Sequence, residues 1–126
     1  MITVICGLIR NSKSQYFIAR RASHKEHAGY WEFPGGKLEH GESHHDCLKR
    51  ELFEELGMQA KIGDLAGENT HKFEGFTIRL VAYHCQFISA TYELSDHDII
   101  EWVDPKHLIN YKLSESDIFF AELLQL

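Results

Sequence analysis

The stretch from Gly36 to Met58, GKLEHGESHHDCLKRELFEELGM, constrains the fold of this chain more than any other. A glycine turn, a lone glutamate, a helical segment and a second glycine, Gly57, follow one another in it. Ser43 with Asp46 three residues later is typical of a helix start, and glycine is favoured just past a helix end. The pattern therefore predicts a helix from about His44 to Leu56.

This helix would bring three carboxylates together. At 100° per residue, a stripe of leucines forms one face, and one edge of that stripe carries Glu51, Glu54 and Glu55. Like charges at these spacings repel each other unless a cation lies among them. Magnesium takes oxygen ligands and commonly bridges carboxylates to substrate phosphates. The three carboxylates could therefore form a metal site, or they could form a solvated acidic face, as an arbitrary E-x-x-E-E usually does. The spacing of the surrounding residues decides between these two interpretations.

The rest of the chain alternates between strand and helix patterns. Residues 3–10 and 15–20 predict an opening hairpin around the polar turn 11–14. Residues 59–73 and 76–88 predict two further strands, the second apolar on both faces and therefore covered on both sides. Residues 99–103 form another strand candidate, and a short helix follows to residue 109. Ser114 or Ser116 begins a last helix with Ile118, Phe119 and Leu123 facing inward. This order of elements predicts an α/β fold with a mixed sheet between helices.

Length and composition point to one domain, residues 1–126. Thirteen basic and nineteen acidic residues give a net charge of −6, which argues against binding nucleic acid or an acidic membrane nonspecifically. Cys6, Cys47 and Cys85 are widely spaced with apolar neighbours, so we expect buried reduced thiols and a cytoplasmic setting. The short apolar start, MITVICGLIR, lacks the basic region of a secretory signal.

The spacing of the central stretch resembles the Nudix box, G-x5-E-x7-R-E-U-x-E-E-x-G-U. Seven identities match it, with apolar residues at both U positions: Gly36, Glu42, Arg50, Glu51, Glu54, Glu55 and Gly57, then Leu52 and Met58. A chance match at a given start is on the order of one in 10⁸ at typical residue frequencies. The resemblance extends to residues 7–42, which look like the amino-terminal half of MutT-type nucleoside triphosphate pyrophosphohydrolases, and to residues 96–102, an acidic residue placed before a tryptophan strand.

The resemblance implies an α/β/α Nudix fold and a hydrolase that depends on Mg²⁺ or Mn²⁺. The expected reaction converts a nucleoside or deoxynucleoside triphosphate to the monophosphate and pyrophosphate. An oxidised nucleotide such as 8-oxo-dGTP is the favoured substrate, in a housecleaning role that links the protein to DNA repair. The alternatives are a CTP or dCTP pyrophosphohydrolase and a catalytically silent nucleotide-binding domain. We expect a monomer whose partner is the small nucleotide, with neither nucleic acid nor membrane involved.

The resemblance also implies the ligands of the metal and the catalytic groups. Its metal ligands would be the carboxylates of Glu51, Glu54, Glu55 and Asp96 and the carbonyl of Gly35. Glu51 would orient or deprotonate the attacking water, with Glu42 or Asp96 as alternatives. Arg50, one turn from Glu54, would hold the carboxylates in place rather than touch substrate. Catalysis is thus assigned to Glu51, Glu54 and Arg50.

Candidate substrate-binding residues lie before the box. The resemblance places Arg21 near the base and Arg20 near the pocket, although two adjacent arginines also suit a solvated face. Phe33 precedes the Pro34 turn and either lines the pocket or belongs to the core. Lys37 either contacts a phosphate or remains a surface lysine.

Asp117 resembles the position from which MutT-type enzymes read the base, where the members specific for 8-oxoguanine carry Asn. An ionised Asp only accepts hydrogen bonds, which suits an exocyclic amine such as cytosine N4. Asp117 therefore makes cytidine nucleotides candidate substrates beside 8-oxo-dGTP. The alternative is that Asp117 caps the last helix.

Overall fold

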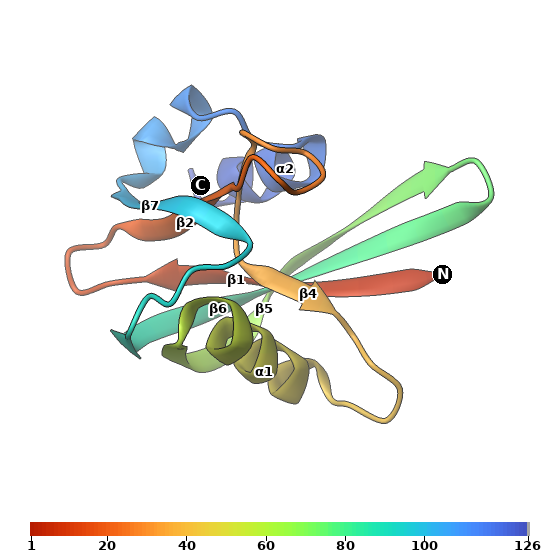
Figure 1. The fold of residues 1–126 in the computed structure, drawn as a ribbon, viewed down its shortest axis with the longest axis horizontal. Helices are drawn as coiled ribbons and strands as arrows, with labels where there is room; N and C mark the ends of the chain where they lie inside the picture. Colours follow the sequence, from red (N-terminus) through yellow and green to blue (C-terminus); the bar gives the residue numbers. More distant parts are fainter. Residues whose placement is uncertain (126) are drawn as a thin grey trace.

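The computed structural model describes residues 1–125 and shows a sheet between helices (Figure 1). The box helix runs from His44 to Leu56, as the sequence predicted. In chain order the elements are β1 (Ile2–Arg10), β2 (Tyr16–Arg21), β3 (Trp31–Glu32), β4 (Gly35–Lys37), α1 (His44–Leu56), β5 (Met58–Phe73), β6 (Phe76–Ala90), β7 (His97–Val103), the 3₁₀ helix η1 (Pro105–Asn110) and α2 (Glu115–Leu123).

The sheet is mixed, because β1 runs parallel to β6 and the other strand pairs are antiparallel. The strand order is β3-β2-β1-β6-β5, with β4 pairing with β1 and β7 pairing with β2. The expected opening hairpin is only partly present, since β1 and β2 pair at Arg10 and Tyr16 and then separate. Residues 5–9 are all buried, so β1 is a central strand that needs partners and cover on both faces.

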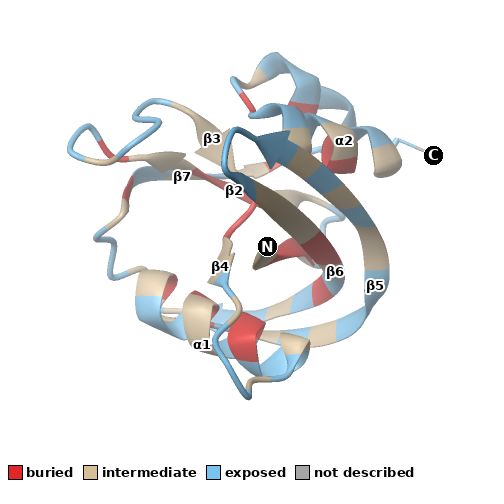
Figure 2. Cartoon of the chain, turned by 90° about the vertical axis from the view of Figure 1, so that its right-hand side faces the viewer, coloured by how far each residue is buried: buried red, intermediate tan, exposed pale blue. Residues whose placement is uncertain are grey.

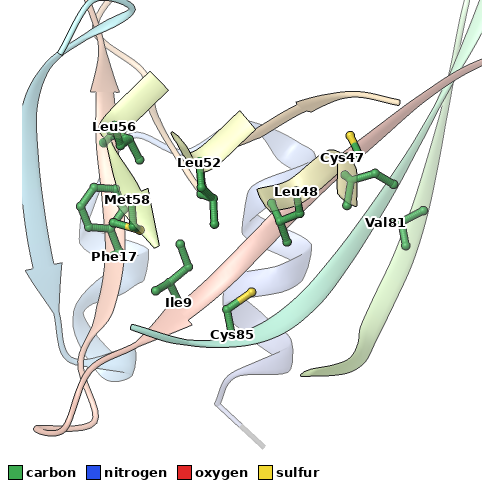
Figure 3. Close-up of a cluster of buried hydrophobic side chains, with 11 residues drawn as sticks. Ile9, Phe17, Cys47, Leu48, Leu52, Leu56, Met58, Val81 and Cys85 are labelled. Carbon is green, nitrogen blue, oxygen red and sulfur yellow. The ribbon is translucent and has the colours of Figure 1, made fainter. Parts of the chain in front are cut away.

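Helices cover both faces of the sheet, which confirms the α/β/α arrangement. On one face α1 presents its leucines to Ile9 and Phe17 of the sheet (Figure 3). On the other face Leu108 of η1 and Phe120 of α2 pack against Leu8 of β1. The amphipathic pattern of α1 therefore fixes which of its edges carries the carboxylates and turns them away from the core.

Two details of the expected packing differ from the structure. Strand β6 is buried on both faces only near Val81 and Ala82, and the β5–β6 hairpin extends beyond the helical layers, so its tip is exposed (Figure 2). At that tip the rings of Phe73 and Phe76 stack on each other in solvent, 5.0 Å apart. In α2, Ile118 is 40% exposed, because the helix turns Phe120 toward the core instead.

The three cysteines are buried and unpaired, as the sequence predicted. Burial raises the pKa of Cys47 and of Cys85 to about 12, which keeps these thiols protonated. No helix within residues 1–125 has the length and apolar character needed to cross a membrane.

The packing of α1 yields a direct test with an adjacent control. Leu52 is 1% exposed, so Leu52→Ala should lower the free energy of unfolding by about 2 to 5 kcal/mol through lost burial and a cavity. Phe53 is 62% exposed, and Phe53→Ala should change it by no more than about 0.5 kcal/mol. Urea denaturation measures both. Equal losses in the two variants would contradict the orientation of α1.

Candidate functional site

The helix α1 is fixed at both ends by the residues that the sequence singled out. The Ser43 hydroxyl accepts a hydrogen bond from the backbone N–H of Asp46 at 3.1 Å, which satisfies one free donor of the first turn. At the other end Gly57 adopts φ +57°, and its N–H donates to the carbonyl of Phe53. The position of the carboxylates along the helix therefore follows from both caps.

Arg50 is the centre of the carboxylate cluster. Its guanidinium binds Glu42 through two hydrogen bonds, Nε to Oε2 at 2.7 Å and Nη2 to Oε1 at 3.0 Å. Nη1 donates to Glu51 Oε1 at 2.8 Å and to Glu54 Oε2 at 3.2 Å, and Nη2 also reaches the Lys37 carbonyl at 3.2 Å. A planar guanidinium with five N–H donors suits this arrangement, whereas a lysine ammonium does not.

The electrostatic effect of Arg50 is clearest at Glu42. Its hydrogen bonds to the guanidinium, together with one from the backbone N–H of Glu39, lower the pKa of Glu42 to about 2. Glu42 is therefore a permanently ionised partner of Arg50. A proton acceptor needs a pKa near the working pH, so Glu42 is poorly suited to be the general base.

Two glycines shape the wall opposite Glu51. A Cβ at Gly36 would overlap the carboxyl group of Glu51, so only glycine leaves room for that side chain. A Cβ at Gly35 would overlap the backbone of Ile5 in β1, which β4 approaches closely. These contacts are the physical reason for two consecutive glycines after Pro34. They place the Gly35–Gly36 backbone beside α1.

Glu55 differs from the other box carboxylates because Arg50 does not reach it. Burial raises its pKa to about 8, helped by the negative charges of Glu51, Glu32 and Asp96 and opposed by Arg21. Its Oε2 atom is buried and has no hydrogen-bond partner within residues 1–125. A buried carboxylate oxygen without a donor, near other carboxylates, is the environment in which a bound cation gives the largest stabilisation.

The residues present therefore fit a hard divalent ion, although the side chains do not form a complete set of ligands. Among residues 1–125, no three His, Cys, Asp or Glu side chains converge closely enough to hold a metal. Glu51 and Glu54 are turned toward Arg50, and Asp96 lies 3.2 Å from the Lys25 ammonium. The oxygen-only donor set and the unpaired Glu55 oxygen suit Mg²⁺ or Mn²⁺ better than zinc.

Asp117 is buried beside the Phe33 backbone, at the other end of the candidate site. Burial raises its pKa to about 8, helped by the charge of Glu32 and opposed by hydrogen bonds to the Phe33 backbone and Ser114. At neutral pH Asp117 is therefore protonated, unlike the ionised group assumed from the sequence. It does not cap α2 either, since Ser114 is the N-cap and accepts from the Asp117 N–H at 3.4 Å.

The two arginines of β2 have different partners. Arg20 binds Asp98 through two hydrogen bonds of 2.9 and 3.1 Å on the exposed side. Arg21 lies 3.6 Å from Glu32 Oε2, and its charge acts on Glu55. Adjacent residues of a strand point to opposite faces, so only Arg21 joins the candidate site. A contact between Arg20 and substrate stays a prediction, and it requires the Arg20 side chain to break its hydrogen bonds with Asp98.

Phe33 and Lys37 also occupy different environments. The Phe33 side chain is 3% exposed and belongs to the core cluster that contains Leu8, Leu108 and Phe120, while its backbone forms a hydrogen bond with Asp117. The Lys37 side chain is exposed next to the carboxylate cluster, and its carbonyl accepts from Arg50. Their roles in binding substrate stay predictions.

The sequence interpretation missed two residues, Glu32 and His97. Glu32 lies close enough to raise the pKa of both Glu55 and Asp117, and the buried His97 contacts Glu32 at 2.8 Å. A signal was present in the sequence, because Glu32 is a charged residue between Trp31 and Phe33 in a short strand.

Comparison with known proteins identifies the family of this chain. A family model described as NUDIX domain matches residues 5–118. A CTP pyrophosphohydrolase of Escherichia coli K12 is 34% identical over 97% of this chain and 90% of its own length. An 8-oxo-dGTP diphosphatase of Haemophilus influenzae is 42% identical over 52% of this chain and 48% of its own length. The chain belongs to the Nudix hydrolase family and is MutT-like.

Solved structures give the same result for the fold. The solution structure of the E. coli ORF135 protein matches with a TM-score of 0.85 and 32% identity, covering 99% of this chain and 89% of that one. The crystal structure of a MutT protein from Methanosarcina mazei Go1 matches with a TM-score of 0.86 and 27% identity, covering 98% and 93%. Family membership makes the chain a pyrophosphohydrolase and confirms the Nudix fold.

The raised pKa of Asp117 has a measurable consequence for stability. Because burial favours the protonated acid, its contribution is fully present below the unfolded pKa, near 4, and is lost as pH rises through about 8. From pH 5 to 8, wild type should therefore lose stability relative to Asp117→Asn, with a slope of at most about 1.4 kcal/mol per pH unit. Urea denaturation at several pH values measures the difference.

The exposed Glu115 on the same helix supplies the control for this measurement. Glu115→Gln should follow wild type across the whole range, because the Glu115 side chain is exposed to solvent. Parallel stability curves for wild type and Asp117→Asn would contradict the burial of a protonated Asp117.

Proposed function

We propose that the protein hydrolyses a cytidine nucleoside triphosphate, CTP or dCTP, to the monophosphate and pyrophosphate with Mg²⁺ or Mn²⁺. The observation that carries the activity is the carboxylate cluster on Arg50 with Glu55 left uncompensated. The full-length similarity to a CTP pyrophosphohydrolase supports the cytidine substrate. This reverses the order favoured by the sequence, which placed 8-oxo-dGTP first.

A protonated Asp117 is compatible with cytosine. Its carbonyl oxygen accepts from the N4 amine while its hydroxyl donates to ring N3, so one neutral acid satisfies both groups of that edge. The same pair of groups also matches a carbonyl beside an N–H, as on 8-oxoguanine. Asp117 therefore supports base recognition, and 8-oxo-dGTP remains the second candidate through relatives such as the H. influenzae enzyme.

A bound divalent ion would neutralise the phosphates and lower the pKa of a coordinated water. Glu51, Glu54, Glu55, the Gly35 carbonyl and Asp96 are the groups that would hold it. Within the chain, Arg50 fixes Glu51 by binding Oε1, which leaves Oε2 to orient the attacking water and accept its proton. Arg50 acts as the support of the carboxylates and does not need to touch the nucleotide.

The catalytically silent alternative has little support. All four box glutamates are present, and three of them share one arginine in an arrangement that a simple binder does not need. A monomeric state, a cytoplasmic setting and a role in DNA repair remain predictions from the sequence.

The carboxylate assignment predicts a dependence on both metal and α1. Glu54→Gln and Glu55→Gln should each lower kcat by orders of magnitude, and millimolar Mg²⁺ should raise the Tm of wild type because it binds the folded state. A pyrophosphate-release assay and thermal unfolding measure these effects. Glu122→Gln on the exposed side of α2 is the control and should match wild type. Full activity in excess chelator would refute the site.

The substrate assignment predicts both products and a ranking. CTP and dCTP should give the highest kcat/KM in a panel that includes 8-oxo-dGTP, the common triphosphates, ADP-ribose and diadenosine polyphosphates. Chromatography should find monophosphate and pyrophosphate. Orthophosphate as the first product would exclude the proposed cleavage, and a clear preference for 8-oxo-dGTP would restore the order favoured by the sequence.

Base reading by Asp117 predicts a pH effect on activity toward CTP. Above about pH 8 wild type ionises and loses the donor toward cytosine N3, so its kcat/KM for CTP should fall relative to Asp117→Asn, by roughly tenfold for one lost hydrogen bond. At pH 6 the protonated Asp117 offers the same donor and acceptor as Asn, so the two proteins should have similar kcat/KM values for CTP. Steady-state kinetics from pH 6 to 9 tests this, and a ratio between the kcat/KM values of the two proteins for CTP that does not change with pH would exclude Asp117 from base recognition.

A further inference from the structure

His97 is a buried polar side chain that the proposed chemistry does not use. It begins β7, pairs with Arg21 of β2 at a register shift, and is 3% exposed. Its Nε2 lies 2.8 Å from Glu32 Oε2, whereas its Nδ1 is buried and has no hydrogen-bond partner among residues 1–125. Nε2 is therefore the nitrogen that carries the proton and donates to Glu32.

Glu32 lies near both Asp117 and Glu55. The next residue, Phe33, has a backbone hydrogen bond with Asp117 of α2, and the charge of Glu32 acts on Asp117 and on Glu55 of α1. Its own strand is held beside the start of α2, because the Trp31 N–H donates to the Lys112 carbonyl at 2.8 Å. The Glu32 side chain is 28% exposed, so part of it remains open to a ligand.

His97 is the closest donor to the Glu32 carboxylate. Arg21 is farther away, at 3.6 Å, and its Nε donates to the Glu26 carbonyl in an exposed loop. The His97 side chain is fully buried in a paired strand, so its donor atom has little freedom to move. A short hydrogen bond from a fixed donor sets the position of a flexible glutamate better than a longer ion pair does.

We propose that His97 is a positioning residue for nucleotide binding, whose Nε2–H holds the Glu32 carboxylate in place at the candidate site. The inference rests on the proposed function, because it takes the region around Glu32 as the nucleotide site. Loss of the hydrogen bond lets Glu32 rotate and weakens nucleotide binding. The chemical step on α1 is not touched, so kcat changes little.

A pair of amide substitutions separates the two ring nitrogens. In His97→Gln the side-chain amide reaches the position of Nε2 and keeps a donor toward Glu32. In His97→Asn the amide takes the position of Nδ1, which has no partner, and the donor is lost. The first variant should keep the wild-type KM for CTP, and the second should raise it about tenfold with kcat within about twofold.

The test also includes binding without turnover and a second mutation. The α,β-methylene analogue of CTP resists the proposed cleavage, because the methylene group replaces the bridging oxygen that is cleaved. Its Kd, measured by calorimetry with Mg²⁺, should follow the same pattern as KM. In a Glu32→Gln background, His97→Asn should cause no further loss, because both changes remove the same interaction. Thermal unfolding of each variant identifies any loss of fold. If His97 is merely structural, the Asn and Gln variants should lose stability to the same extent.

The outcomes separate this inference from the proposed function. Equal KM and Kd values for the Asn and Gln variants, beside an active wild type, overturn the role of His97 and leave the proposed function intact. A full tenfold effect of His97→Asn in the Glu32→Gln background also overturns it. A third outcome combines two results: His97→Asn alone binds the analogue more weakly, and wild type hydrolyses no triphosphate. This outcome supports the positioning role and overturns the proposed activity.

Discussion

The functional end of this molecule depends on one guanidinium. Arg50 binds Glu42, Glu51 and Glu54, so a helix edge and a loop that would repel each other are held together. The same interaction divides the acidic residues into two groups. Three of the four box glutamates have Arg50 as a cationic partner, whereas Glu55 on the next flank of α1 has no ion pair within residues 1–125 and has a pKa of about 8. A divalent cation would supply the missing charge there.

Strands of the sheet connect the residues around the candidate site. β3, β2 and β7 carry Glu32, Arg21 and His97 side by side, and β4 follows β3 with the Gly35–Gly36 backbone that borders α1. The segment before α2 is joined to β3 at Trp31, which brings the buried Asp117 close to the Phe33 backbone. Paired strands therefore connect this region with the carboxylate cluster on α1 and with Asp117 on α2.

The sequence predicted the parts of the fold that rest on local patterns. The bounds of α1 follow from Ser43, Gly57 and the leucine spacing, and the two long strands follow from their apolar runs. It was less successful where partners are distant in the chain. Strand β4 takes most of the edge of β1 that the expected hairpin would use, at residues 4–6, while β6 pairs in parallel along the other edge.

The candidate site shows the same limit. The box spacing identified Arg50 and its carboxylates, since i to i+4 geometry on a helix is local. The protonation of Asp117, the engagement of Arg20 by Asp98 and the His97 to Glu32 contact depend on burial and on residues up to 78 positions apart, which no local pattern encodes. The environment of Asp117 is therefore the part of the candidate site that required the structure.

The central claim is that the carboxylate left unpaired by Arg50 is where the divalent cation binds. Titration of the metal-free protein with Mn²⁺, followed by the electron paramagnetic resonance signal of the free ion, tests it without relying on activity. Wild type should bind Mn²⁺, and Glu55→Gln should weaken the affinity by about tenfold or more, while Glu122→Gln on the exposed side of α2 should leave it unchanged. Equal Mn²⁺ affinity in wild type and Glu55→Gln would contradict the account.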